Sequence, residues 1–388
     1  MTVSSRPGRS PTTKDHSSET RAAADPGPRN EALEAADRSE FTPPPTDKGN
    51  LGSLKYSFSQ AHNRRTKAGW AREVTVRQLP IAKAIAGVNM RLEAGGIREL
   101  HWHLEAEWAY MLYGHARITA VDEANRTFAA DVKAGDLWFF PSGIPHSIQG
   151  LGPDGCEFLL AFNDGAFSED STFLITDWLA HTPKDVLAKN FGQPEARFDR
   201  LPQQELYIFN GRLPGSLDAD RRQSTQPDVP ESFVYALMDQ PPIRTRGGSV
   251  RIVDSANFKA SKAIAAAYVE VEPGGLRELH WHPHADEWQY YISGSARMTV
   301  FASGSTANTV DFSASDVGYV PRSFGHYIEN TGSDTLRFLE LFASDRYADV
   351  SLTGWMANTP RQLVADHLRV DEDFVTALSQ VKKPVVPG

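Results

Sequence analysis

The sequence predicts an all-β protein made of two tandem β-barrels of the jelly-roll, or double-stranded β-helix, type, with short flanking helices. Two observations carry this prediction. The chain repeats one long motif at a nearly constant distance, and each copy is a series of short apolar runs separated by turn residues. Many short, evenly spaced strands are typical of closed barrels and jelly rolls.

The repeat can be followed residue by residue. Residues 96–103 read GIRELHWH, and residues 275–282 read GLRELHWH. The copies lie 179 residues apart in this segment and 180 apart at the later pair His146 and His326. So constant an offset over so long a stretch indicates two copies of one domain.

Each copy alternates apolar or aromatic runs with clusters of Gly, Pro, Asn and Asp, as strands and turns do. The expected strands cover 108–112, 116–121, 137–140 and 157–162 in the first copy, and 288–292, 296–301, 317–320 and 336–342 in the second. Helical patterns follow each barrel, at 172–179 and 184–189 after the first and at 351–357, 360–367 and 371–378 after the second. Pro183 and Pro360 suit the first turn of a helix.

Composition and repeat divide the chain into three parts. Residues 1–46 are rich in Ser, Thr, Pro, Arg, Glu and Ala, so we expect a disordered or extended arm with a short helix near 30–38. The first barrel domain is expected at 47–230 and the second, with the C-terminal helices, at 231–388. The polar, glycine-containing segment 163–172 has the character of a lid that opens and closes over a buried site.

Composition also argues against several classes of protein. The 388 residues are 40% hydrophobic and 23% charged, an ordinary globular balance, and the net charge of −9 disfavours a nucleic-acid-binding surface. No apolar run approaches the ~18 residues that cross a bilayer, and the N-terminus lacks the apolar core of a secretory signal. The single cysteine, Cys156, permits no internal disulfide. We therefore expect a cytoplasmic protein with no nucleic-acid or membrane partner.

Three histidines and one glutamate in the first copy predict a metal site. His101 and His103 are two residues apart, so on a strand their side chains face the same side. Glu107 follows four residues later, and His146 lies on a later strand. Three neutral imidazoles and one carboxylate suit Mn²⁺ or Fe²⁺ better than structural Zn²⁺, and they leave positions open for water or substrate.

The second copy carries the same set as His280, His282, Glu287 and His326. One isolated histidine of this kind would be an ordinary core or surface residue. Recurrence of all four ligand types at matching spacing in both copies instead predicts two metal ions per chain.

At these residues the chain resembles the cupin family. The glycines, histidines, glutamate and proline of both cupin motifs stand in the first copy at Gly95, His101, His103, Glu107, Gly114, Gly135, Pro141, Gly143 and His146. The second copy keeps the ligands but has Ser315 and Ser323 where the family usually has glycine. Over about residues 47–385 the chain is similar to the bicupin oxalate decarboxylases in particular.

This resemblance implies manganese-dependent decarboxylation of oxalate to formate and carbon dioxide. It also implies two manganese ions per chain, dioxygen as a co-catalyst, and a homo-oligomer that is a trimer or a hexamer. Similar enzymes carry a Ser-Glu-Asn-Ser-Thr lid whose glutamate is the proton donor. Residues 168–172 read Ser-Glu-Asp-Ser-Thr, which makes Glu169 the expected donor and Asp170 a departure from the pattern. The extra negative charge acts either on Glu169 or on the closure of the lid.

Three more side chains are candidates for chemistry. Arg98, just before His101, is expected to bind the carboxylates of oxalate, for which its planar guanidinium is suited. Arg277 repeats it in the second copy as a further substrate-binding candidate, and Glu340 is a catalytic candidate near the second metal. The alternatives without a role in chemistry are a structural ion pair for each arginine and, for Glu340, a buried acid whose hydrogen bonds are satisfied within the core. Because the segment after the last strand is shorter in the second copy, we expect oxalate at the first metal.

Three other functions stay open on the sequence. An oxalate oxidase would use the same scaffold and metal to release carbon dioxide and hydrogen peroxide, and the lid glutamate argues against it. A non-catalytic storage or binding bicupin commonly lacks the ligands, and eight intact ligands argue against that. A metal-dependent dioxygenase or isomerase acting on another small acid is the third alternative.

Overall fold

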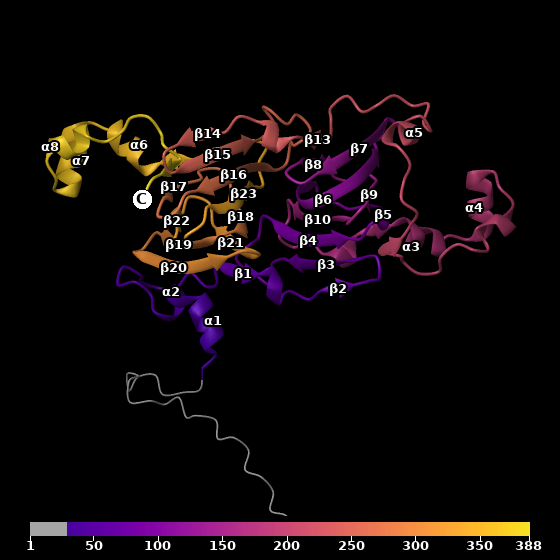
Figure 1. Ribbon diagram of the computed structural model, residues 1–388, viewed down its shortest axis with the longest axis horizontal. Helices are drawn as coiled ribbons and strands as arrows, with labels where there is room; N and C mark the ends of the chain where they lie inside the picture. Colours follow the sequence, from indigo (N-terminus) through magenta and orange to yellow (C-terminus); the bar gives the residue numbers. More distant parts are fainter. Residues whose placement is uncertain (1–28) are drawn as a thin grey trace, which may run out of the picture.

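The structure is a computed structural model and describes residues 29–388. Two β-barrels lie side by side along the long axis of the molecule, with short helices at both ends (Figure 1). The predicted fold class, an all-β chain of two tandem barrels with short flanking helices, is confirmed.

The first barrel is one continuous, curled sheet of twelve strands. Its strands are β2 (Arg64–Arg65), β3 (Gly69–Val74), β4 (Ala86–Leu92), β5 (Gly96–Trp102), β6 (Glu107–Val121), β7 (Thr127–Lys133), β8 (Leu137–Phe140), β9 (His146–Gly150), β10 (Cys156–Phe162), β11 (Phe173–Leu174), β12 (Ile208–Asn210) and β13 (Val234–Tyr235). The runs predicted at 108–112 and 116–121 form the single strand β6. It passes from one face of the barrel to the other at Gly114, whose φ of 74° and close approach to the carbonyl of Gly155 leave no room for a side chain.

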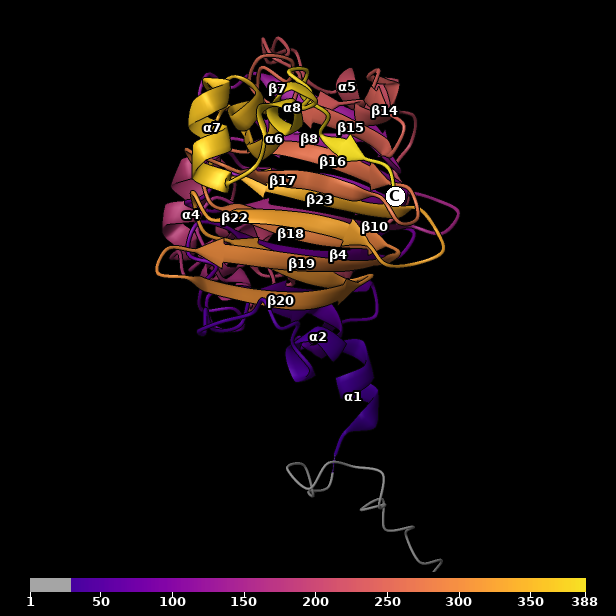
Figure 2. The ribbon, with the colours of Figure 1, turned by 90° about the vertical axis from the view of Figure 1, so that its left-hand side faces the viewer.

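The second barrel is built from a seven-stranded and a six-stranded sheet. Its strands are β1 (Lys55–Ser57), β14 (Ile243–Thr245), β15 (Gly248–Val253), β16 (Ala265–Val271), β17 (Leu276–Trp281), β18 (Glu287–Ser293), β19 (Ser295–Ala302), β20 (Thr306–Ser313), β21 (Asp316–Val320), β22 (Gly325–Asn330), β23 (Leu336–Phe342), β24 (Val350–Ser351) and β25 (Val385–Val386). Seen from this end, the strands of the two sheets run across the barrel almost parallel to one another (Figure 2).

The two barrels exchange short strands. β1 precedes the first barrel in the chain but pairs with β21 of the second, and β13 follows the first repeat but pairs with β8 of the first barrel. The predicted boundaries at 47 and 231 therefore do not separate two independent sheets. Each barrel is completed by a strand that lies on the far side of the predicted boundary.

The described part of the N-terminal arm lies on the second barrel. Two short helices, α1 (Glu31–Ala36) and α2 (Arg38–Phe41), replace the single helix expected near 30–38. The Ser39 amide donates to Asp311 on β20 at 2.6 Å, and Lys55 pairs with Asp37. Figure 1 shows both helices beneath β20. The prediction of a disordered arm over residues 1–28 lies outside the described residues.

Helices extend from both ends of the molecule. They are α3 (Ile175–Ala180), α4 (Lys184–Phe191) and α5 (Leu217–Arg221) in the first half, and α6 (Leu352–Ala357), α7 (Arg361–Leu368) and α8 (Glu372–Thr376) in the second. Four 3₁₀ turns complete the elements: η1 (Phe58–Gln60), η2 (Glu169–Ser171), η3 (Glu195–Phe198) and η4 (Leu237–Asp239). α4 and the α7–α8 pair project from opposite ends of the long axis (Figure 1).

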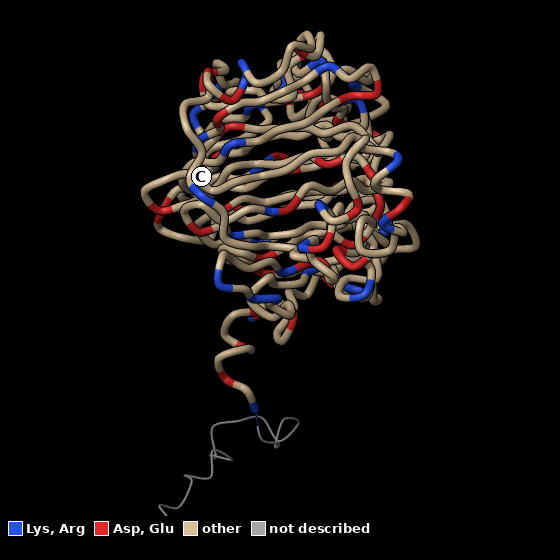
Figure 3. The backbone as a smooth tube through the Cα atoms, turned by 90° about the vertical axis from the view of Figure 1, so that its right-hand side faces the viewer, with Lys and Arg blue, Asp and Glu red and all other residues tan. Residues whose placement is uncertain are grey.

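A continuous apolar core joins the barrels. It includes Trp108 and Phe158 of the first barrel and Trp288 and Leu341 of the second, all fully buried. Cys156 is also buried in this core, where burial raises the pKa of its thiol to about 12 and makes it a packing residue. Seen from the end of the first barrel, basic and acidic residues are interspersed along the strands and loops (Figure 3). Within residues 29–388, none of the helices combines the length and apolar character needed to cross a membrane.

Candidate metal centres and active site

The first predicted ligand set comes together inside the first barrel. His101 on β5 lies opposite His146 on β9, while His103 directly follows β5 and Glu107 begins β6. One ligand atom from each side chain lies within 4.8 Å of the others, and all four residues are buried. Side-chain alternation along β5 and the pairing of β5 with β9 account for this convergence.

The second set converges in the same way. His280 on β17 lies opposite His326 on β22, and His282 and Glu287 complete the group within the same 4.8 Å limit. Each chain therefore has two metal-binding sites of three histidines and one glutamate.

All six histidines are oriented by their own backbone surroundings. In each ring Nδ1 lies against a carbonyl oxygen, and because a carbonyl only accepts, Nδ1 carries the hydrogen and Nε2 keeps its lone pair. The contacts are His101 to Glu99 at 2.6 Å, His103 to Glu105 at 2.6 Å, His146 to Ile144 at 2.7 Å, His280 to Glu278 at 2.6 Å, His282 to Ala348 at 2.8 Å and His326 to Phe324 at 3.1 Å.

The inward-facing atoms fit a cation. Nε2 of His282 and of His326 lie 2.9 and 2.8 Å from Oε2 of Glu287 but make no hydrogen bond with it among the described residues. Buried polar atoms without partners cost free energy, and a bound metal ion would satisfy them together. Burial, followed by the charge of Arg98, lowers the pKa of His101 well below its usual range, which favours the neutral ligand form.

The two glutamate ligands are supported by different neighbours. In the first site the indole of Trp138 donates to Oε1 of Glu107 at 3.1 Å. In the second, Gln289 donates to Oε1 of Glu287 at 2.8 Å. In the first barrel the small Ala109 on β6 lies opposite the large Trp138 on β8. In the second barrel the larger residue, Gln289, is on β18, which corresponds to β6, and the small Gly318 is on the opposite strand β21. No local pattern in the sequence indicates this exchange, because it shows only when the strands are aligned side by side.

Arg98 and Glu169 meet beside the first metal site. The lid turn η2 places Oε2 of Glu169 3.2 Å from Nη2 of Arg98, and the guanidinium is almost completely buried. Tyr207 donates its hydroxyl to the same carboxylate oxygen at 2.9 Å. Burial raises the pKa of Tyr207, so the phenol keeps its proton and remains a donor. No local sequence pattern marks Tyr207 as a residue of this site, because it lies 109 residues from Arg98.

A buried glutamate of the repeated motif fixes Tyr207. Oε2 of Glu99 accepts from the amides of Leu206 and Tyr207 at 2.8 and 2.6 Å, and Oε1 accepts from Thr176 at 2.8 Å. The Tyr207 ring then lies 4.5 Å from the guanidinium carbon of Arg98. β5 thus supplies the metal ligand, the arginine and the residue that positions the tyrosine.

The lid is also held from outside. The amide of Glu169 donates to Glu73 on β3 at 3.1 Å, and Ser168 is buried and caps the turn through the Asp170 amide. A cavity of about 110 Å³ lies at this point, bordered by Arg64, Arg72 and both lid acids.

Arg277 in the second copy has different partners from Arg98. It is fully buried and contacts Glu340 at 2.9 Å, Asp349 at 2.8 Å and the Tyr347 hydroxyl at 2.8 Å. Leu160 occupies the strand position in the first barrel that Glu340 occupies in the second. The structure therefore joins Arg277 and Glu340 in one ion pair; their part in chemistry stays a prediction.

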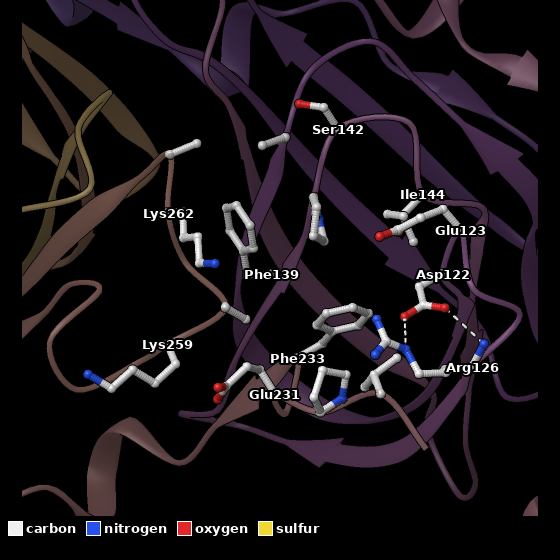
Figure 4. A pocket seen from close by; sticks show the side chains of 16 residues that line it. Asp122, Glu123, Arg126, Phe139, Ser142, Ile144, Glu231, Phe233, Lys259 and Lys262 are labelled. Carbon is white, nitrogen blue, oxygen red and sulfur yellow. Dashed lines mark hydrogen bonds and ion pairs between the residues drawn. The ribbon is translucent and has the colours of Figure 1, made fainter. Parts of the chain in front are cut away.

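A larger cavity of about 470 Å³ lies between the barrels. Phe139 and Phe233 come from the first barrel and its following segment, and Lys259 and Lys262 from the second (Figure 4). None of the eight metal ligands lines it.

Comparison with known proteins identifies the fold and its relatives. The sequence model of the cupin family (Cupin_1, "Cupin") matches residues 56–196 and 235–376. Oxalate decarboxylase OxdC of Bacillus subtilis is 57% identical over 359 residues, which is 92% of this chain and 93% of that one. A solved structure from work on the Mn(II) centres of Bacillus subtilis oxalate decarboxylase superimposes with a TM-score of 0.93 at 56% identity, covering 95% of this chain and 98% of that one.

A second solved structure bears on the lid. It is a variant of the same Bacillus subtilis enzyme in which a Ser-Glu-Asn-Ser segment is changed to Asp-Ser-Ser-Asn, with a TM-score of 0.92, 55% identity, and coverage of 96% and 98%. Residues 168–171 of this chain match the unchanged segment except at Asp170. On the family match, the relatives and the two ligand sets, the chain belongs to the cupin family and, within it, to the two-cupin oxalate decarboxylases.

Proposed function

We propose that this protein decarboxylates oxalate to formate and carbon dioxide at the first metal site, with manganese as the metal and dioxygen as co-catalyst. The observation that carries the proposal is the group of Arg98, Glu169 and Tyr207 beside the first ligand set. Similarity to the Bacillus subtilis decarboxylase over nearly the whole chain supports it.

The ligand set fits manganese. His101, His103, His146 and Glu107 would hold the ion through three imidazole nitrogens and one carboxylate, a mixed set that suits Mn²⁺. A bound manganese ion supplies a binding point for a carboxylate and a centre that can change its oxidation state.

Arg98 binds and orients the substrate. Its guanidinium is buried beside the metal ligands and now pairs with Glu169, a carboxylate. A carboxylate of oxalate can take the same fork of N–H donors, and such charge-assisted bonds are strong in a buried site. The ring of Tyr207 keeps the guanidinium in place while its partner changes.

Glu169 supplies the proton that the reaction consumes. The balance is C₂O₄²⁻ + H⁺ → HCO₂⁻ + CO₂, in which the C–C bond breaks and a C–H bond forms. General acid catalysis requires a carboxyl group that closes onto the carbon, and Glu169 is carried by a lid turn that reaches the first site. The corresponding segment of the second half, residues 343–351, contains no glutamate. Its Tyr347 and Asp349 contact Arg277.

The second site is proposed to hold metal without turning over oxalate. Glu340 and Asp349 both form ion pairs with the guanidinium of Arg277, and all three side chains are buried. A substrate carboxylate would have to displace one buried partner and leave its charge unpaired, which is costly.

The test is a product assay on manganese-loaded protein with oxalate in air at mildly acidic pH, measuring formate and hydrogen peroxide together. We expect one formate per oxalate and little peroxide. Glu169→Gln keeps the shape of the lid but cannot give a proton, and we expect formate production to fall by about 10²-fold or more. Peroxide without formate from the unchanged protein would establish an oxidase, and neither product would indicate another substrate or a storage protein.

We also propose that the chain forms a homo-oligomer, a trimer or hexamer as in related bicupins. Large apolar side chains are exposed on helices at both ends, including Trp178 at 63% and Trp355 at 59%. Exposed apolar surface of this kind marks interaction sites. Sedimentation of the purified protein checks the assembly, and a monomer would contradict it.

A further inference from the structure

We propose that an ion pair between Arg64 and Asp170 is a latch that holds the lid, residues 163–172, closed over the first site. The inference rests on the proposed function and extends it to control of the lid. Nη1 of Arg64 on β2 lies 3.6 Å from Oδ1 of Asp170 in the lid turn η2. This pair joins the lid to the edge of the first barrel, on the outer side of Glu169.

Arg64 is fixed to the wall of the site by other contacts. Its guanidinium carbon lies 3.6 Å from the centre of the Tyr207 ring, and Nη2 hydrogen-bonds Glu205. Tyr207 is the residue that also donates to Glu169. The two adjacent acids of the lid therefore contact two adjacent side chains beside the site: Glu169 accepts from Tyr207, and Asp170 pairs with Arg64.

The latch balances a charge that the departure at Asp170 introduces. Glu73, Glu169 and Asp170 form a cluster of three carboxylates, and burial, then the charges of both lid acids, work to raise the pKa of Glu73. Repulsion among these carboxylates opposes closure of the lid. Arg64 places a positive charge next to Asp170, the residue that replaces the neutral asparagine of relatives. Arg98 does the same for Glu169.

The latch is weak enough to open in each turnover. The Asp170 side chain is 81% exposed and that of Arg64 34%, and exposed pairs at such distances contribute little. A contribution of this size changes the ratio of closed to open lid by about two- to fivefold. The lid can still release product.

The closed fraction decides which product forms. With Glu169 over the site, the carbon receives a proton and leaves as formate. With the lid open, the proton donor is away from the carbon, and oxidation can compete: C₂O₄²⁻ + O₂ + 2H⁺ → 2CO₂ + H₂O₂. Weakening the latch should therefore raise the yield of peroxide per formate.

The experiment compares four manganese-loaded proteins: the unchanged chain, Asp170→Asn, Arg64→Gln and the double variant. Asp185→Asn is the matched control, because it removes an exposed ion pair with Lys189 on α4, outside the lid. Hydrogen exchange of the peptide that contains residues 163–174 measures the lid without turnover. Formate and peroxide from oxalate measure the partition.

We expect faster exchange of the lid peptide and about a two- to fivefold rise in peroxide per formate in Arg64→Gln, which leaves the charge of Asp170 unbalanced beside Glu73 and Glu169. Adding Asp170→Asn to Arg64→Gln should not loosen the lid further, since a broken pair cannot be broken twice. High salt should shift the unchanged protein toward Arg64→Gln. Asp185→Asn should match the unchanged protein throughout.

Unchanged exchange in Arg64→Gln, or further loosening of the lid when Asp170→Asn is added to it, would overturn the latch. Because exchange needs no substrate, it separates the two proposals. A lid that loosens in a protein without formate production would sustain the latch and refute the proposed function.

Discussion

Arg98 and Arg277 hold the same position in two copies of one motif, yet their partners give them different capacities. Arg98 pairs with Glu169, which a lid turn carries and which can move away. Arg277 pairs with Glu340, which belongs to the rigid strand β23, and the pair is fully buried. An arginine with a movable partner can accept a substrate carboxylate, whereas one with fixed buried partners stabilises the fold.

The network around Arg277 predicts how stability depends on pH. Burial opposes the charge on Asp349, but Arg277 and Lys382 outweigh it and lower its pKa to about 2. An unfolded aspartate has a pKa of about 3.9, so the stabilisation is complete above about pH 4 and is lost as the pH falls toward 2. Asp349→Asn should lower the free energy of unfolding of metal-free protein by about 2 kcal/mol at pH 5 and by little near pH 2.

Urea titration at both pH values measures this difference. Asp366→Asn, at an exposed position on α7, serves as the control and should change the free energy of unfolding by less than about 0.5 kcal/mol. An equal loss at both pH values for Asp349→Asn would contradict the assigned network.

At this scale the sequence predicted the residues that belong to a repeated local motif. In each set two histidines stand two residues apart and the glutamate follows four residues later in the first copy and five in the second, and the structure brings each set together. Tyr207 could not be found in this way, because it lies 109 residues from Arg98 and no local pattern links them. Trp138 stood inside a predicted strand, but its bond to Glu107 depends on strand pairing.

The exchanged strands are the main feature at the scale of elements. β1 adds an edge to the sheet of the second barrel, and the chain then enters the first barrel through Phe58 in η1. Phe58 is fully buried and contacts Tyr290 of the second barrel, while its carbonyl accepts from Arg72 of the first. This turn therefore belongs to both barrels.

Phe58→Ala should weaken both barrels together. Truncating a fully buried phenylalanine typically costs about 3–5 kcal/mol, because apolar contacts are lost and a cavity remains. We expect that loss in chemical denaturation, with faster hydrogen exchange in β3 of the first barrel and in β21 of the second. Phe301→Ala, at a side chain that is 55% exposed on β19, should cost less than about 1 kcal/mol. Faster exchange in one barrel alone would show that Phe58 does not couple them.

Periodicity predicted which segments are strands but not how they pair. The two runs at 108–112 and 116–121 are one strand because Gly114 lets the chain continue through a bend. The exchange of β1 and β13 has no local signal, since both are two or three residues long and owe their conformation to a neighbouring strand. The lid was predicted from the polar, glycine-containing character of residues 163–172 and from the similarity of residues 168–172 to the lid of related enzymes.

The whole molecule is a duplicated barrel in which the duplicated parts have separated in function. The ligand sets are alike in both halves, and the differences lie around them. Leu160 of the first half is replaced by Glu340 in the second. The lid of the first half carries Glu169, whereas the corresponding segment of the second half carries Asp349. Metal binding belongs to both halves, and the proposed chemistry belongs to the half with a proton donor.

This division can be tested by removing one metal at a time. Glu107→Gln and Glu287→Gln each remove the only charged ligand of one site, so each variant should bind about one manganese per chain where the unchanged protein binds two. Elemental analysis of the purified proteins gives the metal content. Both variants should melt at lower temperature, because a metal that binds only the folded chain stabilises it.

The two variants should differ in activity. Glu107→Gln removes the metal beside Arg98 and Glu169, and its formate production should fall by about 10²-fold or more. Glu287→Gln leaves that site intact and should lose less than about tenfold. Loss of formate in Glu287→Gln with one manganese still bound would mean that the second site takes part in the reaction, and the buried pair of Arg277 with Glu340 would then have a chemical role.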